Sequence, residues 1–404
     1  MKILRIVLLV FSSWVIWLLV SQFFFCPRYQ FNDPIPFEGT ALYNPYDSIH
    51  TAQRNAARRS AARWVKCNFH AHSRAWEGVT NGHGTAADIH NAYRALHYGV
   101  HCVSNYHHID TTHSTRANYL SAYEHGYNIR KTHQLVLGSN EVQWLDYLFP
   151  QTTHNKQHVL NHLTGSDNVV ILNHPALKNG YTAEDLAQLT HYDCMEVLNP
   201  SVTSTAQWDA ALSAGKRVFI VGDDDVHDVI SKKRLGTRCT FVNVRENSAR
   251  EVIRALKTGQ SYGAIVGENQ RHDSIPQLKS LTVNHDTITA LMTQTADEVT
   301  VTGQNGKVLA LAHDTDRVSH RITPEERYAR VTFKYANGTE ILLNPVFFTP
   351  KKGYQPVPVY ENFNETMFFR SVGTCVLGGW LLLMVRLTTG QPPQRYGRRR
   401  LSWR

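Results

Sequence analysis

The sequence predicts an α/β protein with an additional β-rich region and apolar ends. Three observations support this fold class: strand-like and helix-like segments alternate through residues 64–275, β-forming runs with turn signals fill residues 276–360, and an apolar run lies near each terminus. Alternating strands and helices are typical of parallel β/α units. The pattern leaves open whether these units close into a barrel or form an open, doubly wound sheet.

Residues 1–26 predict an uncleaved N-terminal transmembrane anchor. From Ile6 to Phe25 the chain runs for 20 residues without a charged side chain, which is long enough to cross ~30 Å of hydrocarbon. The run ends in bulky phenylalanines rather than in small residues, so an anchor is favoured over a cleaved signal peptide. Residues 27–63 predict a proline-containing linker and then an Ala-rich helix over 48–63.

Residues 64–275 contain seven strand-like runs separated by helical patterns. The expected strands are 65–70, 100–105, 135–141, 169–174, 194–199, 217–222 and 238–244. The expected helices are 86–98, 114–131, 154–163, 182–189, 204–214 and 249–258. The sequence contains neither a glycine-rich dinucleotide fingerprint nor a P-loop, so a nucleotide-cofactor fold is not indicated.

The pattern changes after Pro276. β-forming runs separated by Asn-Gly turn signals predict a small antiparallel β-domain over 276–360. An apolar segment over 367–386 predicts a second transmembrane helix, with an amphipathic surface helix as the alternative because Arg370 lies near its start. A basic tail follows over 387–404.

The net charge of +9 arises entirely at the two ends of the chain. Residues 26–366 contain 33 Lys and Arg and 33 Asp and Glu, so the middle is neutral. This distribution argues against specific nucleic-acid binding. Under the positive-inside rule both basic ends lie in the cytoplasm. We therefore expect a protein of the bacterial inner (cytoplasmic) membrane, in contact with the lipid bilayer, whose middle region faces the periplasm.

Residues of the metal-ligand types recur where the predicted strands end. They are His70 and His72 after the first strand, Glu141 at the third, His174 at the fourth, and Asp225 and His227 after the sixth. Residues two apart on a strand point to the same side, so His70 and His72 are placed to bind one ion together. Enzymes built from β/α units carry their chemistry at these strand ends. The ordered set therefore predicts a multinuclear metal site.

In this order the residues resemble the polymerase and histidinol phosphatase (PHP) family of metal-dependent phosphoesterases, over about residues 64–265. The family's motifs match His70, His72 and Ser73, then Glu141, His158, His174 with Pro175, and Asp225 with His227. The resemblance implies a distorted seven-stranded (β/α)7 TIM-like barrel. It also implies two or three divalent ions (Mn, Fe or Zn) as cofactors.

The second motif of the family is altered in this chain. Asn105 and Tyr106 stand where the family has Asp and His. His107 or His108 would have to replace the missing histidine. The Asp-Gly that follows the first motif begins here with Asn81. Because these positions would serve a third ion, a dinuclear core is favoured over a trinuclear one.

The predicted function is the hydrolysis of phosphate mono- or diesters by a metal-bridged hydroxide at a di- or trinuclear site. The expected metal ligands are His70, His72, His107, Glu141, His158, His174, Asp225 and His227. The expected catalytic residues are Glu141, Asp225 and His227, and the expected contacts for a phosphorylated small molecule or nucleotide are Arg74, Lys178 and Arg234. Two alternatives stay open: a catalytically weakened metal-dependent binding or sensor module, and a metal-dependent amide or ester hydrolase.

Overall fold

The computed structural model describes residues 2–47, 62–80 and 82–389. Most of the helix expected over 48–63 and most of the basic tail lie outside the described residues, as does Asn81. The chain divides into two compact units, one formed by Met1–Gln30 with Glu361–Arg404 and the other by Phe31–Tyr360.

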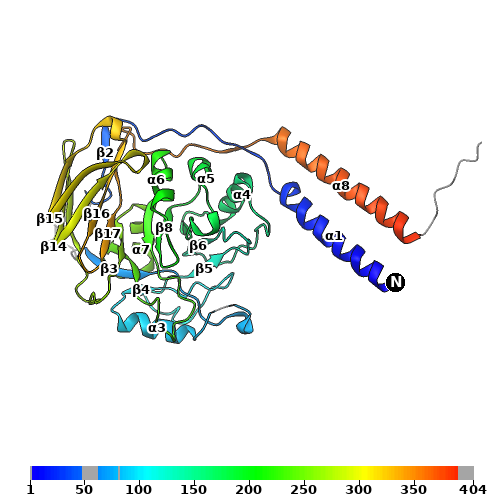
Figure 1. Ribbon diagram of the computed structural model, residues 1–404, viewed down its shortest axis with the longest axis horizontal. Coiled ribbons are helices and arrows are strands. Elements are labelled where there is room, and N and C mark those ends of the chain that lie inside the picture. The colour runs from blue at the N-terminus through cyan, green and yellow to red at the C-terminus, as the bar shows by residue number, and fades with distance from the viewer. Residues whose placement is uncertain (1, 48–61, 81, 390–404) are drawn as a thin grey trace, which may run out of the picture. The chain divides into compact units, whose positions relative to one another are not determined.

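The smaller unit is a pair of apolar helices, α1 (Lys2–Phe24) and α8 (Phe363–Thr389). Each is long and apolar enough to cross a membrane by length and composition. The helices lie side by side and antiparallel (Figure 1), because Trp380 Nε1 donates to Ser13 Oγ at 3.0 Å and Arg370 Nε donates to Phe24 O at 3.4 Å. The start of α1 and the end of α8 therefore lie at the same end of the pair.

The larger unit contains two main sheets. The six-stranded sheet has the order β10-β8-β7-β6-β5, with β9 beside β8. Strands β7, β8 and β10 run parallel to one another, whereas β6 runs antiparallel to both β5 and β7. Its strands are β5 (Ala122–His125), β6 (Gln134–Leu137), β7 (Val169–Leu172), β8 (Cys194–Asn199), β9 (Val202–Thr203) and β10 (Phe219–Gly222).

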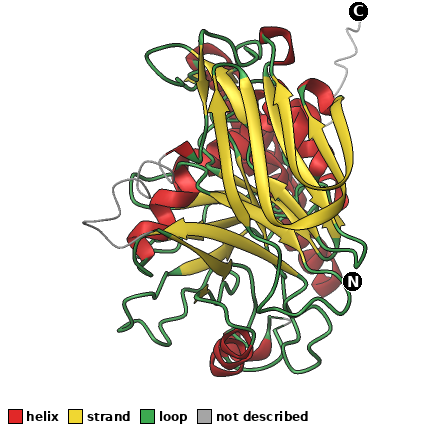
Figure 2. Ribbon diagram, turned by 90° about the vertical axis from the view of Figure 1, so that its left-hand side faces the viewer, coloured by secondary structure: helices red, strands yellow, loops and turns green. Residues whose placement is uncertain are grey.

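The eleven-stranded sheet has the main order β13-β14-β16-β17-β12-β11-β3-β4, and Figure 2 shows its long strands. Three further strands pair outside this order: β15 with β14, β18 with β16, and β2 with β18. Its strands are β2 (Ala41–Tyr43), β3 (Arg63–Asn68), β4 (Val100–His101), β11 (Arg238–Val244), β12 (Ser261–Ile265), β13 (Leu278–Asn284), β14 (Thr287–Thr302), β15 (Val308–Arg321), β16 (Tyr328–Lys334), β17 (Glu340–Leu343) and β18 (Val346–Thr349). Two further short strands are β1 (Tyr29–Gln30) and β19 (Tyr360–Glu361).

Helices connect and cover these strands. They are α3 (Ala86–Ala95), α4 (Thr153–Leu163), α5 (Ala183–Gln188), α6 (Thr205–Ser213) and α7 (Ala249–Lys257), with 3-10 turns η1 (Trp76–Gly78), η2 (Leu177–Asn179), η3 (Gln304–Gly306) and η4 (Pro324–Glu326). Three of the helices begin with a reciprocal capping box, which satisfies backbone N–H groups of the first turn. The boxes are Thr85 with Asp88, Thr152 with Asn155, and Thr182 with Asp185.

The predicted (β/α)7 barrel is wrong. Within the described residues neither main sheet closes on itself, and the chain has seven α-helices. Strand β11 runs antiparallel to both β3 and β12, so these strands do not form the parallel ring of a barrel. A short apolar strand buried on both faces reads the same in either direction, so the sequence pattern did not reveal the strand direction. The strands after Pro276 also join β12 through β17 in one sheet rather than forming a sheet of their own.

The helix expected over 114–131 is also wrong. The segment contains β5, whose four residues are all buried and pair antiparallel with β6. Pairing with β6 and complete burial override a helical pattern that was weak in this polar segment. This difference matters for the site, because β5 carries Glu124.

Candidate metal centre

The candidate centre lies where the two main sheets meet. Single parallel bridges join the two sheets: Ala71, after β3, pairs with Val226, after β10, and Tyr106, after β4, pairs with Glu124 in β5. The backbone N–H of His72 donates to Val226 O at 2.7 Å, which fixes the chain after β3 against the chain after β10. Loops from both sheets therefore converge on one buried volume.

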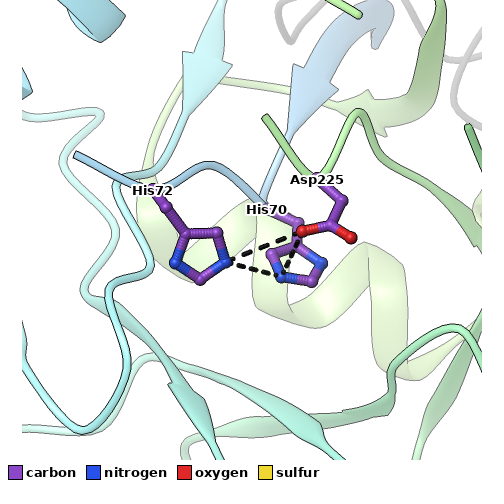
Figure 3. Close-up of side chains that lie close together, drawn as sticks. All are labelled: His70, His72 and Asp225. Carbon is purple, nitrogen blue, oxygen red and sulfur yellow. Dashed lines mark hydrogen bonds and ion pairs between the residues drawn. The ribbon is translucent and has the colours of Figure 1, made fainter. Parts of the chain in front are cut away.

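His70, His72 and Asp225 form the first cluster (Figure 3). The Nε2 atoms of His70 and His72 are 3.1 Å apart, and Asp225 Oδ1 lies 3.3 Å from His70 Nε2 and 3.7 Å from His72 Nε2. Both histidines are completely buried. Two imidazoles and a carboxylate that aim their ligand atoms at one point are a donor set for a divalent transition metal.

Glu124, His133 and His174 form the second cluster. Glu124 Oε1 lies 2.8 Å from His133 Nδ1 and 3.4 Å from His174 Nε2. Its other oxygen, Oε2, lies 3.0 Å from His72 Nε2 and 3.3 Å from His70 Nε2. One carboxylate thus faces both clusters, with one oxygen toward each. This is the arrangement of a carboxylate that bridges two ions.

A second layer of polar groups holds these ligands in place. Glu196 on β8 accepts from the backbone N–H of His174 at 2.8 Å and lies 3.0 Å from His70 Nδ1. Asn199 donates to both Glu196 and Asp225 at 3.2 Å. Such partners fix the ring orientation and tautomer of a ligand histidine. The histidine rings also stack, with His72 and His227 parallel at a centroid distance of 4.3 Å.

The pKa shifts reflect the close approach of buried carboxylates and imidazoles. Burial lowers the pKa of His70, but the surrounding carboxylates outweigh burial and hold that pKa well above its usual value. Burial raises the pKa of Glu124, yet His70 and His133 hold it well below its usual range. Burial likewise raises the pKa of Asp225, and imidazoles again hold it low. For His72, burial has the largest effect and lowers the pKa to about 4.

The residues present fit divalent cations. Glu124, Glu196 and Asp225 are all buried, and among the described residues no Lys or Arg forms an ion pair with them. Buried carboxylates are costly unless a cation compensates them. Glu124 Oε2 and Asp225 Oδ1 also have no hydrogen-bond partner in the described structure. A cation at each cluster would satisfy both oxygens.

Two of the candidate ligands have an unusual backbone conformation. His174 has φ of +30° and Asp225 has φ of +46°, a region that residues with a Cβ rarely occupy. Each such residue costs about 1–3 kcal/mol, and such residues concentrate at functional sites. Here the strained backbone turns both side chains toward the shared volume.

Five of the predicted site residues are brought together. They are His70, His72, His174, Asp225 and His227. His227 Nε2 lies 3.1 Å from Asp225 Oδ1, and its side chain is 26% exposed. Asp223 and Asp224 precede Asp225 in the chain, but their carboxylates accept hydrogen bonds from the backbone instead. Asp223 accepts from the N–H of Phe69 at 2.6 Å, and Asp224 accepts from the N–H of Gly236 at 2.6 Å.

Three predicted ligands lie outside the two clusters. Glu141 is exposed in a loop, where Ser139 donates to its carbonyl oxygen. His158 lies on α4 with its Nδ1 atom 2.6 Å from the hydroxyl of Tyr147. His107 is buried, but both of its ring nitrogens contact backbone groups, Gln143 O at 3.1 Å and Gly126 N at 3.0 Å. None of the three contributes to the clusters.

The predicted substrate contacts differ in position. Arg234 lines a cavity of about 360 Å³ together with Asp225, His227 and Lys233. Its guanidinium donates to Ser201 Oγ at 2.8 Å. Arg74 and Lys178 are exposed on loops that follow His72 and His174. The cavity beside Asp225 thus has cationic groups at its wall.

Sequence analysis missed two members of the clusters, Glu124 and His133, together with the supporting residues Glu196 and Tyr106. Tyr106 stacks on His72 with a centroid distance of 4.7 Å, and its backbone forms a bridge with that of Glu124. A signal for Glu124 was available in Tyr123-Glu124-His125, where a carboxylate and an imidazole stand side by side directly before Gly126. It was hidden by the expected helix over 114–131.

Comparison with known proteins yields little. No family model and no curated protein matches the chain. One solved structure, a two-domain protein from Bacteroides vulgatus containing a predicted PHP-like metal-dependent phosphoesterase, is similar at 13% identity and a TM-score of 0.40. The match covers 81% of this chain and 99% of that chain. A likeness at this level decides neither fold nor function.

Proposed function

We propose that the protein is a phosphoesterase that depends on two divalent metal ions bridged by Glu124. The observation that carries the proposal is the division of one buried carboxylate between two histidine clusters, at 2.8 Å from His133 and 3.0 Å from His72. His70, His72 and Asp225 would hold one ion, and His133 and His174 the other. When bound, two such ions supply a water nucleophile at neutral pH and neutralise charge on phosphoryl oxygens.

The chain's own residues prepare the site for a phosphate ester. Arg234 and Lys233 at the wall of the adjoining cavity provide cationic donors for phosphate oxygens. Asp225 and Asn199 are hydrogen bonded to each other and fix one side of the pocket. His227 lines the same cavity, contacts Asp225 and stacks on His72, and its imidazole would give a proton to the leaving oxygen.

The proposal includes membrane attachment. The apolar pair α1 and α8 would anchor the chain, and the positive-inside rule would put both basic termini in the cytoplasm and residues 31–360 in the periplasm. A reporter fused after Arg404 tests this topology. Cytoplasmic activity of the reporter is expected, and periplasmic activity contradicts the proposal.

The catalytic proposal is tested with the full-length protein in detergent, loaded with Mn²⁺ and supplied with a panel of phosphate mono- and diesters. Turnover of at least one ester is expected for the wild type and for Glu141→Gln, but not for Glu124→Gln. Absence of turnover on the whole panel, with two ions bound, would overturn the proposal and favour a binding module.

A further inference from the structure

A second cavity lies at the opposite end of the parallel strands from the metal centre. Its volume is about 230 Å³. Its walls come from the loops before β8 and β10, from the end of α7 and from the segment that contains Tyr354. Asp193 and Phe219, at the amino ends of β8 and β10, line it. His174 and Asp225 follow the carboxyl ends of β7 and β10, and a four-residue strand spans ~13 Å.

Lys216 is a buried cation at this cavity without a counter-ion. It is 8% exposed, and its ammonium group donates to Gln188 O at 3.2 Å. In the described part of the chain that carbonyl is its one acceptor, and it forms no ion pair. Burial lowers its pKa to about 8. An ammonium group has three donors and is costly to bury unpaired, so the site lacks an anionic partner.

The groups around Lys216 are also arranged for an anion. Arg217 and Lys257 line the same cavity, and Lys257 Nζ lies 4.0 Å from the single lining carboxylate, Asp193. Tyr192 also lines the cavity, and its hydroxyl is buried without a hydrogen-bond partner among the described residues. Three cations against one carboxylate leave an excess of two positive charges. A phosphate monoester dianion matches this excess, whereas one carboxylate ligand does not.

We propose that this cavity, lined by Lys216, Arg217, Lys257 and Tyr192, binds the phosphate group of a small ligand or of a lipid headgroup. It is a binding site separate from the metal centre, because it lies at the amino ends of strands whose carboxyl ends carry the metal ligands. Lys216 and the Tyr192 hydroxyl supply the buried donors, and Arg217 and Lys257 supply charge at the rim. The proposal goes beyond phosphoesterase activity and does not depend on it.

The test measures how fast the amino group of Lys216 reacts with acetic anhydride. Full-length protein in phosphatidylcholine vesicles is acetylated briefly with acetic anhydride, and acetylation of each lysine is quantified by mass spectrometry. Inorganic phosphate is the first probe, and phosphatidic acid added to the vesicles without free phosphate is the second. Lys279, exposed on β13, is the internal control. Protection of Lys216 by inorganic phosphate indicates a free ligand, and protection by phosphatidic acid indicates a headgroup.

With a saturating probe, acetylation of Lys216 should slow about tenfold while Lys279 is unaffected, because only the unoccupied fraction reacts. No protection by either probe, or equal slowing at Lys279, overturns the proposal. In Lys257→Gln, protection of Lys216 should require about tenfold more probe, the value of one charged hydrogen bond. In Glu124→Gln, the probe concentration that protects Lys216 should be the same as in the wild type. Loss of protection in Glu124→Gln would instead place the bound phosphate at the metal centre.

Discussion

The two ends of strands β7, β8 and β10 carry opposite unbalanced charges. At the carboxyl ends, buried carboxylates face histidines and no Lys or Arg of the described residues pairs with them. At the amino ends, Lys216 is buried without a carboxylate partner. If these buried groups served only the stability of the fold, we would expect carboxylates and cations to be paired with one another. The comparison teaches that both ends of these strands lack counter-charges: the carboxyl ends lack cations, and the amino ends lack an anion.

The largest expected effect comes from the residue shared by the two clusters. Glu124→Gln keeps the shape but removes the bridging charge, so turnover should fall by about 10³-fold, equivalent to about 4 kcal/mol of transition-state stabilisation. Bound metal, measured by elemental analysis, should fall from two ions per chain to one or none. Glu141→Gln is the matched control at an exposed carboxylate and should retain both ions.

Lys216→Met extends this test to the opposite end of the strands. It should leave metal content and turnover as in the wild type, since Lys216 is remote from the ligands. Loss of metal in Lys216→Met would contradict the division of the molecule into two independent ends.

The next effect separates the two clusters. His133→Asn should weaken binding of one ion by about 100-fold or more while the ion at His70 and His72 remains. Metal titration should then show one tight and one weak site. His158→Asn, a change of the same kind on α4, should bind both ions normally. Two tight sites in His133→Asn would remove His133 from the ligand set.

Metal binding should release protons. Although burial lowers the pKa values of His70 and His174, nearby carboxylates raise both above the usual value, so both imidazoles hold their protons to higher pH than free histidine does. An ion binds neutral imidazole, so its apparent affinity should rise about tenfold per pH unit for each proton released. The rise should end once the pH passes the raised pKa values. Calorimetry in buffers of different ionisation enthalpy measures the release, and pH-independent affinity would contradict it.

The smallest effect concerns the altered second motif. Tyr106→Phe keeps the ring that stacks on His72 but removes the hydroxyl, whose pKa burial and the nearby carboxylates of Glu124 and Asp225 raise. Because the hydroxyl would support a ligand without being one, turnover should fall about tenfold and metal content should be unchanged. A loss of metal equal to that in Glu124→Gln would show that Tyr106 itself is a ligand.

Sequence patterns identified the candidate ligands that directly follow apolar strands, but not Glu124 or His133. His70, His72, His174, Asp225 and His227 were found because each lies just after an apolar strand, where a polar residue is conspicuous. Glu124 lies inside β5, in a stretch with a helical pattern, and the exposed Glu141 took its place in the motif order. Neighbouring strands decide whether such a segment forms a strand, and no local pattern contains that information.

The same limit explains why the predicted fold was wrong. The positions of strands β3, β7, β8, β10 and β11 were predicted to within a few residues, since their apolar runs are distinct. Their directions were not, because β11 is buried on both faces and its sequence is equally compatible with parallel and antiparallel pairing. The predicted ring of parallel strands was implied by the family resemblance, and the apolar runs alone did not test it.

The most direct test is anomalous diffraction from crystals of the Mn²⁺-loaded protein. Two peaks are predicted on either side of the Glu124 carboxylate, ~4 Å apart as in two-metal sites. One should contact His70, His72 and Asp225, and the other His133 and His174. A single peak, or a peak bound by Glu141 or His158, would contradict the bridged pair.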